Sequence, residues 1–187
     1  MSEQDEKPLA STPAIKNSKR LFFALWPDDV VVKKIKQHVL KHVMDCQGKI
    51  VKQHNWHITL AYFGSADADT QSCLEAHAEK ITAQPFELNL TKCGFWQRPK
   101  VAWLAPADIP DALQQLVHEL QHEITACGFT IEERDYSPHL TLVRKAKSTP
   151  ALEKVSPIKM KVSSFCLVES KTYPDGAEYK VIKQWEL

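Results

Sequence analysis

The chain has 187 residues, of which 25% are charged, and its formal net charge at pH 7 is +1. This length suggests one domain that can bury a substantial core. The nearly balanced charge excludes a strongly basic or strongly acidic class of protein, so any contact with RNA must depend on a local basic patch.

The cysteines and apolar segments indicate where the protein works. The cysteine count is five, an odd number, and no two are spaced as Cys-x-x-Cys. We therefore expect neither a disulfide framework nor a zinc knuckle, and we predict a reducing, cytoplasmic environment. No apolar run approaches the length of a membrane span, and the polar, acidic N-terminus lacks the features of a signal peptide. The cysteines are Cys46, Cys73, Cys93, Cys127 and Cys166.

The N-terminal part of the chain predicts a tail, a strand and a helix. Residues 1–18 combine charges with Ser, Thr and Pro without periodicity, which predicts a disordered tail before a single domain over residues 19–187. The apolar run at 21–26 has the length of a strand, and Pro27-Asp28-Asp29 ends it and opens a helix. Aliphatic residues at every fourth position continue this helix to about residue 46: Val31, Ile35, Val39 and Val43.

The middle of the chain predicts strands on either side of one helix. We expect a turn at 47–49, a strand over 56–63, a loop over 64–69, a helix over 70–83 and a strand over 86–95. The sequence Gln-Arg-Pro-Lys at 97–100 then predicts a hairpin connection to a partner strand at 101–104.

The C-terminal part predicts one more helix and four strands. Asp108 is expected to cap the helix, with Pro110 near its start and Gly128 at its end. Its apolar stripe is formed by Ile109, Leu113, Leu116, Val117, Leu120 and Ile124. We then expect a short strand at 129–131, a strand over 139–144, a loop over 145–157, a strand over 160–168, a turn at 173–176 and a strand over 179–182. Strands joined by hairpins indicate an α+β fold of mainly antiparallel sheets.

A short motif occurs twice, each time inside an apolar run. The sequence His57-Ile58-Thr59-Leu60 is repeated nearly unchanged as His139-Leu140-Thr141-Leu142. Successive side chains of a strand point to opposite faces, so each unit can present its histidine and threonine on one face and bury its two apolar residues. Two such strands in related halves would place two imidazoles and two hydroxyls around one cleft. The alternative is that both histidines are half-buried and bonded to backbone.

This set of side chains suits the opening of a cyclic phosphodiester. The reaction needs a base that takes a proton from attacking water and an acid that protonates the leaving ribose oxygen. Imidazole is the side chain whose ordinary pKa lies near neutrality, so two histidines can divide these tasks. Threonine hydroxyls can donate hydrogen bonds to the charged phosphate oxygens.

A second histidine pair matches a metalloprotease pattern but lies on the wrong helix face. Residues 118–122 read His-Glu-Leu-Gln-His, the pattern of zinc-protease helices. On a helical wheel, however, His118 and His122 lie opposite the apolar stripe, where no buried cleft supplies a third ligand. We therefore expect a solvent-exposed helix face and no metal ligands. His54 and His77 carry no partner signal.

Three segments resemble a known family: residues 20–27 (RLFFALWP), 57–64 (HITLAYFG) and 137–144 (SPHLTLVR). They are similar to the two-histidine phosphoesterases, and most similar to the bacterial RNA 2′,3′-cyclic phosphodiesterases, historically called 2′-5′ RNA ligases. The resemblance implies a bilobal, pseudo-twofold fold with helices outside and the two motifs facing a central groove. It also implies metal- and cofactor-free opening of RNA 2′,3′-cyclic phosphates to 2′-phosphomonoesters, and reversible 2′-5′ ligation without ATP.

The resemblance also implies roles for individual residues. His57 would be the general acid and His139 the general base, although the near symmetry of the motifs leaves this assignment open. Thr59 and Thr141 would hold the phosphate oxygens. Arg144 could meet the phosphate charge, but strict alternation places it on the face opposite His139, so it needs a bulge or a strand end.

Further candidates for RNA contact follow from position and residue type. Arg98 and Lys100 could line the groove, and Arg20 and Arg134 are candidates on position alone. An aromatic ring that stacks a base could come from Phe22, Trp56 or Tyr136, for each of which core packing is the alternative. We expect a monomer that acts on RNA ends. The alternatives are another nucleotide substrate, such as a 2′-5′ oligonucleotide or ADP-ribose cyclic phosphate, and an RNA-binding module without turnover.

Overall fold

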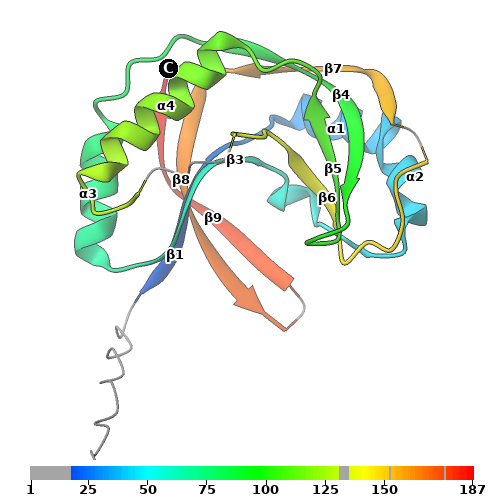
Figure 1. Cartoon of the computed structure of the whole chain (residues 1–187), viewed down its shortest axis with the longest axis horizontal. Coiled ribbons are helices and arrows are strands. Elements are labelled where there is room, and N and C mark those ends of the chain that lie inside the picture. Colours follow the sequence, from blue (N-terminus) through cyan, green and yellow to red (C-terminus); the bar gives the residue numbers. More distant parts are fainter. Residues whose placement is uncertain (1–17, 131–134, 152, 175) are drawn as a thin grey trace, which may run out of the picture.

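The computed structural model describes residues 18–130, 135–151, 153–174 and 176–187. Within them, the strands form one antiparallel sheet in the order β7-β4-β5-β6-β3-β1-β8-β9, and β2 pairs with β6 off this path (Figure 1). The strands are β1 (Lys19–Leu25), β2 (Lys49–Ile50), β3 (Ile58–Ala66), β4 (Phe86–Trp96), β5 (Val101–Pro106), β6 (Leu140–Arg144), β7 (Lys154–Val162), β8 (Ser164–Tyr173) and β9 (Gly176–Glu186). The helices are α1 (Asp29–His38), α2 (Leu40–Val43), α3 (Ala68–Ala78) and α4 (Asp111–Thr125), with single 3₁₀ turns at Met44–Cys46 and Gln53–Asn55. The predicted α+β class is confirmed.

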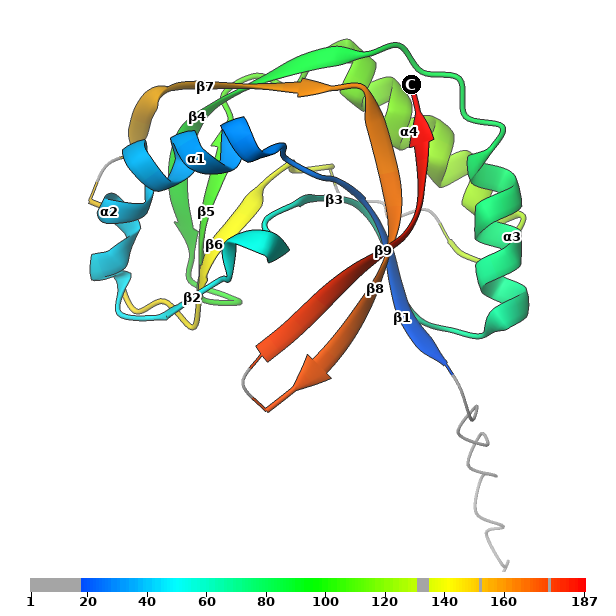
Figure 2. The ribbon, with the colours of Figure 1, turned by 180° about the vertical axis from the view of Figure 1, so that it is seen from behind.

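The two motif strands, β3 and β6, are neighbours in the middle of the sheet. The quartet β7-β4-β5-β6 extends to one side of this junction and the quartet β3-β1-β8-β9 to the other. Helix α1 packs against β7, while α4 packs against β3 and α3. Figures 1 and 2 show α1 and α2 with the first quartet, α3 and α4 with the second, and the β8–β9 hairpin extending away from the rest of the sheet. The expectation that the two motif strands lie side by side is confirmed.

The first helix forms where its sequence predicts, although it is interrupted. Asp28 is its N-cap, and its carboxylate accepts a hydrogen bond of 2.7 Å from the backbone N–H of Val31. The four aliphatic residues of the stripe are all buried, at 0–2% exposure. Helix α1 ends at His38, and the one-turn helix α2 follows a cap at Val39.

The start of α4 differs from the prediction. Five residues of its predicted apolar stripe are buried within the helix, but Ile109 is half-buried and precedes it. The N-cap is Pro110 and the first residue is Asp111, so Asp108 lies outside the helix and does not cap it. Pro110 has extended backbone geometry and makes no side-chain cap bond. The predicted end is correct, because the chain turns after Thr125 and Gly128 adopts a φ of +84°, a left-handed conformation that favours glycine.

The strand predicted over 160–168 is two strands. It breaks at Ser163, so that β7 pairs with β4 in one quartet while β8 pairs with β1 in the other. The sequence does not reveal that the chain passes from one quartet to the other at Ser163, because the segments on both sides contain buried apolar residues. These are Met160 and Val162 in β7, and residues 165–168 in β8.

Smaller boundary predictions were also wrong. The loop expected to run to residue 157 ends where β7 begins at Lys154. The helix expected over 70–83 spans Ala68–Ala78 behind an Asp67 cap. Phe129 and Thr130 are not in a strand, while Ile131 lies outside the described residues. The predicted disordered tail also lies outside them, apart from Ser18.

One disulfide joins two helical regions, which the sequence did not indicate. Cys73 in α3 is bonded to Cys127, just after α4, at an S–S distance of 2.08 Å and a sequence separation of 54 residues. The expectation that the cysteines form no disulfide framework is therefore wrong for this pair. Cys46, Cys93 and Cys166 are buried, free thiols. Among the described residues, no helix is long and apolar enough to cross a membrane.

Candidate active site

The strand register at the centre of the sheet fixes the geometry of the site. Ile58 of β3 pairs with Leu140 of β6 in an antiparallel ladder, and both side chains are fully buried. Because side chains alternate along a strand, the residues on either side of this pair point to the other face of the sheet. The apolar residues of both motifs thus hold the two strands together from the core, as the sequence predicts.

The register allows the four polar motif residues to form a cross-strand square. The pair Ile58–Leu140 joins the two strands, and continuing this register by one residue in each direction would place His57 opposite Thr141 and Thr59 opposite His139. Side chains directly opposite each other have Cβ atoms about 4.5–5.5 Å apart, and diagonal neighbours are about 7–8 Å apart. Since the histidines occupy one diagonal and the threonines the other, a phosphate group can lie between the two imidazoles and contact both hydroxyls. All four side chains are half-buried.

Both imidazoles are held in the same orientation. His57 Nδ1 lies 2.7 Å from the backbone oxygen of Asn55, and His139 Nδ1 lies 2.9 Å from that of Ser137. A carbonyl oxygen can only accept, so each Nδ1 donates its proton and the lone pair of each neutral ring is on Nε2. His57 Nε2 is 3.2 Å from the Thr59 hydroxyl oxygen.

A cavity of about 400 Å³ opens beside the first motif. Its walls come from β1, β3 and the end of β6, and from the β8–β9 hairpin, which closes one side. Its lining residues are Arg20, Phe22, His57, Thr59, Tyr62, Arg144, Ser170, Thr172, Ala177 and Tyr179. The cavity therefore combines the first motif with two arginines and three aromatic rings, which suits a nucleotide with its phosphate at His57.

A bulge in β6 brings Arg144 to this cavity. In the β5–β6 ladder Trp103 pairs with Thr141, whereas Ala102 pairs with Val143, so Leu142 is an extra residue. The bulge shifts the alternation by one position, and both Leu142 and Val143 are buried. Arg144 consequently lines the cavity, and its Nη2 lies 3.5 Å from the Tyr179 hydroxyl. The bulge on which the Arg144 prediction depended is present.

The surroundings of His57 favour its neutral form. Its ring stacks on Trp26 at a centroid distance of 5.5 Å and also contacts Phe22 at 4.8 Å and Tyr179 at 5.0 Å. The pKa of His57 is lowered to about 4, mainly by burial and also by the nearby charges of Arg144 and His139, while the bond to Asn55 opposes the shift. His57 is thus a neutral imidazole at pH 7 in the free protein.

His139 has a different aromatic neighbour. Trp96 at the end of β4 contacts its ring edge-on at 4.4 Å, and Trp103 supports Trp96 at 5.3 Å. Gly94 makes room for this support: it pairs with Trp103, and a Cβ at that position would lie 2.2 Å from the indole ring. Glycine at position 94 therefore allows the backbone of β4 to approach Trp103, which supports Trp96 beside His139.

Asn55 and Tyr179 are site residues that sequence reasoning missed. The Asn55 side chain is 4% exposed; it donates to Ala177 O at 2.7 Å and accepts from Tyr179 N at 3.2 Å. Asn55 therefore ties the start of β9 to the segment that holds His57. No sequence spacing connects these positions, because the pairing arises from how the β8–β9 hairpin folds back.

The other basic candidates have different outcomes. Arg20 lines the cavity, where its guanidinium donates to the Tyr62 hydroxyl at 2.7 Å and 3.0 Å and to that of Thr172 at 3.3 Å. Arg98 and Lys100 are exposed in the β4–β5 turn and do not line the cavity. Arg134 lies outside the described residues.

The candidates for base stacking also have different outcomes. Phe22 lines the cavity, although it is only 3% exposed. Trp56 is 1% exposed and donates to Val51 O from its indole nitrogen, so it is a core residue. Tyr136 donates its hydroxyl hydrogen bond to the backbone oxygen of Thr59 at 3.0 Å, and burial raises its pKa. Tyr136 therefore supports the first motif through a hydrogen bond to its backbone.

The metalloprotease-like pair on α4 faces solvent. His118 and His122 are both exposed, and the His122 side chain is 75% accessible. The predicted exposure of this helix face is confirmed.

Comparisons with known proteins agree with this arrangement. Residues 25–174 match the family model of the 2′-5′ RNA ligase superfamily. The RNA 2′,3′-cyclic phosphodiesterase of Escherichia coli (strain K12) is 29% identical over 169 residues, which cover 90% of this chain and 96% of the relative. That of Archaeoglobus fulgidus is 28% identical over 178 residues, which cover 89% and 99%. The crystal structure of E. coli LigT complexed with 3′-AMP matches with a TM-score of 0.84 and 29% identity, covering 91% of this chain and 99% of that one.

Proposed function

The chain belongs to the 2′-5′ RNA ligase superfamily, and we propose that it opens 2′,3′-cyclic phosphate ends of RNA to 2′-phosphomonoesters. The observation that supports the proposal is the pairing of Ile58 with Leu140, which makes the motif strands β3 and β6 neighbours. This pairing allows His57, Thr59, His139 and Thr141 to form a square around one phosphate. The relatives named RNA 2′,3′-cyclic phosphodiesterase support the same substrate.

The two imidazoles divide the proton transfers. In this scheme water attacks phosphorus, His139 Nε2 takes a proton from the water, and the bond from phosphorus to the ribose 3′ oxygen breaks. His57 Nε2 gives a proton to that oxygen, which leaves a 3′ hydroxyl and a 2′-phosphomonoester. Both rings can act through Nε2 because both Nδ1 atoms bond to backbone carbonyls.

An acid role for His57 requires proton uptake when the substrate binds. Its pKa of about 4 makes it neutral in the free cavity at pH 7. The negative charge of a cyclic phosphate beside it favours the imidazolium and raises the pKa. Substrate binding should therefore take up a proton, and affinity should increase as pH falls toward 4. Calorimetry in buffers of different ionisation enthalpy can detect this proton with the His139→Ala variant, which prevents turnover. The double variant His57→Ala/His139→Ala should take up no proton.

The charge on the phosphate is met by hydroxyls and one arginine. Thr59 and Thr141 occupy the second diagonal of the square and donate to the non-bridging oxygens. Arg144 at the rim of the cavity adds a guanidinium that can bind phosphate. These groups do not depend on a metal ion, so we propose that the activity persists in EDTA. We also propose a monomer, working in the cytoplasm.

The direct test uses an oligonucleotide that ends in a 2′,3′-cyclic phosphate. The expected product carries its phosphate at the 2′ position, with an unchanged rate in EDTA. A 3′-phosphate product would contradict the assigned leaving oxygen, and loss of activity in EDTA would contradict the metal-free mechanism. Tight nucleotide binding without any product would instead favour a binding module. Adding a 5′-hydroxyl RNA without ATP then tests the reverse reaction, in which a 2′-5′ bond forms.

A further inference from the structure

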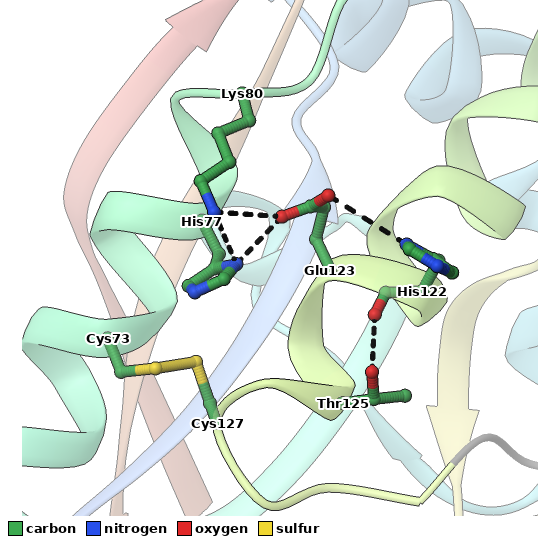
Figure 3. A network of polar contacts seen from close by, with 7 residues as sticks. All are labelled: Cys73, His77, Lys80, His122, Glu123, Thr125 and Cys127. Carbon is green, nitrogen blue, oxygen red and sulfur yellow. Dashed lines mark hydrogen bonds and ion pairs between the residues drawn. A yellow bond between two sulfur atoms is a disulfide. The ribbon is translucent and has the colours of Figure 1, made fainter.

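Two facing helices carry a second group of chemically reactive side chains, away from the residues that line the cavity. Cys73 and His77 are four residues apart on α3, so they share one helix face. Glu123 near the end of α4 and Cys127 just beyond it have the same spacing. Figure 3 shows the two pairs turned toward each other across the contact between α3 and α4.

The geometry of this group matches a metal site. One ligand atom each from Cys73, His77 and Cys127 lies within 4.8 Å of the other two, and all three residues are half-buried. Two thiolates and an imidazole are a ligand set that Zn²⁺ prefers, and its bonds to sulfur and nitrogen are about 2.3 Å and about 2.0–2.1 Å long. Once the disulfide is opened, changes of about 1–2 Å in the sulfur positions bring the three atoms to these distances.

The imidazole is already oriented as a ligand. His77 Nδ1 lies 2.7 Å from Glu123 Oε2 and 3.1 Å from Lys80 Nζ. We assign its proton to the shorter contact, because the carboxylate can only accept, and Nε2 then carries the lone pair that binds a metal. Lys80 Nζ lies 3.4 Å from the same carboxylate and offsets its charge (Figure 3). Two thiolates then balance the charge of a divalent cation. Carboxylate–histidine–zinc arrangements of this kind recur in zinc proteins.

We propose that Cys73, His77 and Cys127 bind Zn²⁺ when the Cys73–Cys127 disulfide is reduced, with Glu123 holding His77 in place. Reduction by a thiol compound transfers two electrons and two protons to the disulfide and converts two molecules of that thiol into its own disulfide. Binding of Zn²⁺ then displaces the two protons from the Cys73 and Cys127 thiols. A water molecule fills the fourth position. The disulfide and the zinc complex are thus alternative links between α3 and α4.

The remaining cysteines do not compete for the metal. Cys46, Cys93 and Cys166 are buried, and burial raises the pKa of Cys93 to about 11 and that of Cys166 to about 12. They therefore stay protonated near neutrality, whereas zinc binds the thiolate. Metal binding in the folded protein should be confined to the pair on α3 and α4.

The test compares metal binding by the full chain in its two redox states. The oxidised protein, and protein reduced with a phosphine and desalted without oxygen, are titrated with Zn²⁺ against a coloured chelator and with Co²⁺ as a spectroscopic probe. The reduced protein should bind one equivalent, show the thiolate charge-transfer absorption of tetrahedral Co²⁺, and melt at a higher temperature with zinc than without it. The oxidised protein should bind at least 100-fold more weakly.

Variants assign the ligands. Cys73→Ser and the double variant Cys73→Ser/Cys127→Ser should lose at least about 100-fold in affinity and the charge-transfer band. Glu123→Gln should weaken binding about 10-fold, since changes behind a ligand typically cost 10–100-fold. Glu119→Gln, one turn earlier on α4, is the matched control and should bind normally. Circular dichroism checks that each reduced variant is folded.

Two outcomes would overturn the zinc site. The first is a folded, reduced wild-type protein that binds no stoichiometric Zn²⁺. The second is undiminished binding by the folded double serine variant, which would place the metal elsewhere. Both readouts are independent of the proposed RNA chemistry, so the zinc site and the proposed function can fail separately.

Discussion

The two halves of the site share a local design but have different surroundings. In each motif the imidazole donates its Nδ1 proton to the carbonyl two residues earlier, from Asn55 in the first case and Ser137 in the second. His57, however, borders the cavity and is enclosed by three aromatic rings. These are Phe22 in β1, Trp26 just after β1 and Tyr179 in β9. His139 meets the indole of Trp96 from β4.

This difference shows which properties a repeated motif can determine. Four residues with alternating polarity determine which face the imidazole occupies and which nitrogen it presents, because these depend on the strand itself. The pKa depends on burial and neighbouring charges, which distant strands supply. The pKa of about 4 for His57 therefore arises from the fold around the motif rather than from the motif.

The largest expected effect comes from removing either imidazole. His57→Ala and His139→Ala should each lower kcat/KM for a cyclic-phosphate substrate by about 10²–10⁴, because each removes one of two proton transfers. The double variant should be only slightly worse than the poorer single variant, since groups that act as a unit are not additive. Steady-state kinetics, with circular dichroism to verify folding, give the comparison. Full activity in both single variants would eliminate the shared mechanism.

The next effect concerns the contribution of His57 to the free energy of unfolding. The pKa of His57 is about 4 in the folded protein and about 6.5 in an unfolded chain, so the unfolded state binds more protons between these values. The resulting stabilisation is complete above about pH 6.5 and is lost as the pH falls toward 4. The difference between the two pKa values sets its upper limit at about 3 kcal/mol. The actual stabilisation is smaller, because His57 remains partly accessible to water.

Urea unfolding at a series of pH values measures this dependence. The His57→Gln variant should lose less stability than the wild type between pH 6.5 and 4. Equal acid sensitivity in wild type and His57→Gln would show that His57 does not titrate with a depressed pKa.

A smaller effect tests the support that the Asn55 side chain gives to the first motif. Asn55→Ala removes both bonds to the β9 segment and leaves the Tyr179 N–H and the Ala177 carbonyl without the Asn55 side chain. The cost to the free energy of unfolding should be about 1–3 kcal/mol. Ser137→Ala is the matched change in the second motif; its side chain is exposed, and the loss should be within about 0.5 kcal/mol. Similar losses in the two variants would remove the distinction.

The sequence predicts the parts of the site that depend on local periodicity. It identifies both motifs, their burial pattern and their neighbouring strands, because Ile58 and Leu140 can be buried only if the histidines face outward. It also shows that Arg144 needs a bulge, but not that Leu142 forms one. The bulge depends on the register of β6 against β5, which becomes fixed only when the sheet assembles.

Three features that sequence analysis missed depend on distant contacts. Tyr179 reaches His57 through the β8–β9 hairpin, and Cys73 meets Cys127 through the packing of α3 against α4. The crossing at Ser163 was hidden because both flanking strands have buried apolar residues. In each case the local pattern is compatible with more than one partner, and the three-dimensional packing selects one.

The smallest expected effect tests whether the β6 bulge gives the first motif its phosphate-binding cation. Arg144 and Lys145 are adjacent, exposed cations, yet only Arg144 lines the cavity beside His57. Arg144→Gln should lower kcat/KM about 10-fold through loss of a charged hydrogen bond to phosphate. It should also raise the pKa of His57, because the Arg144 charge helps to lower it. Lys145→Gln should leave both quantities nearly unchanged.

Kinetics at low ionic strength, together with the imidazole titration followed by NMR, separate the two variants. Equal losses would mean that general positive charge, rather than the position created by the bulge, attracts the substrate.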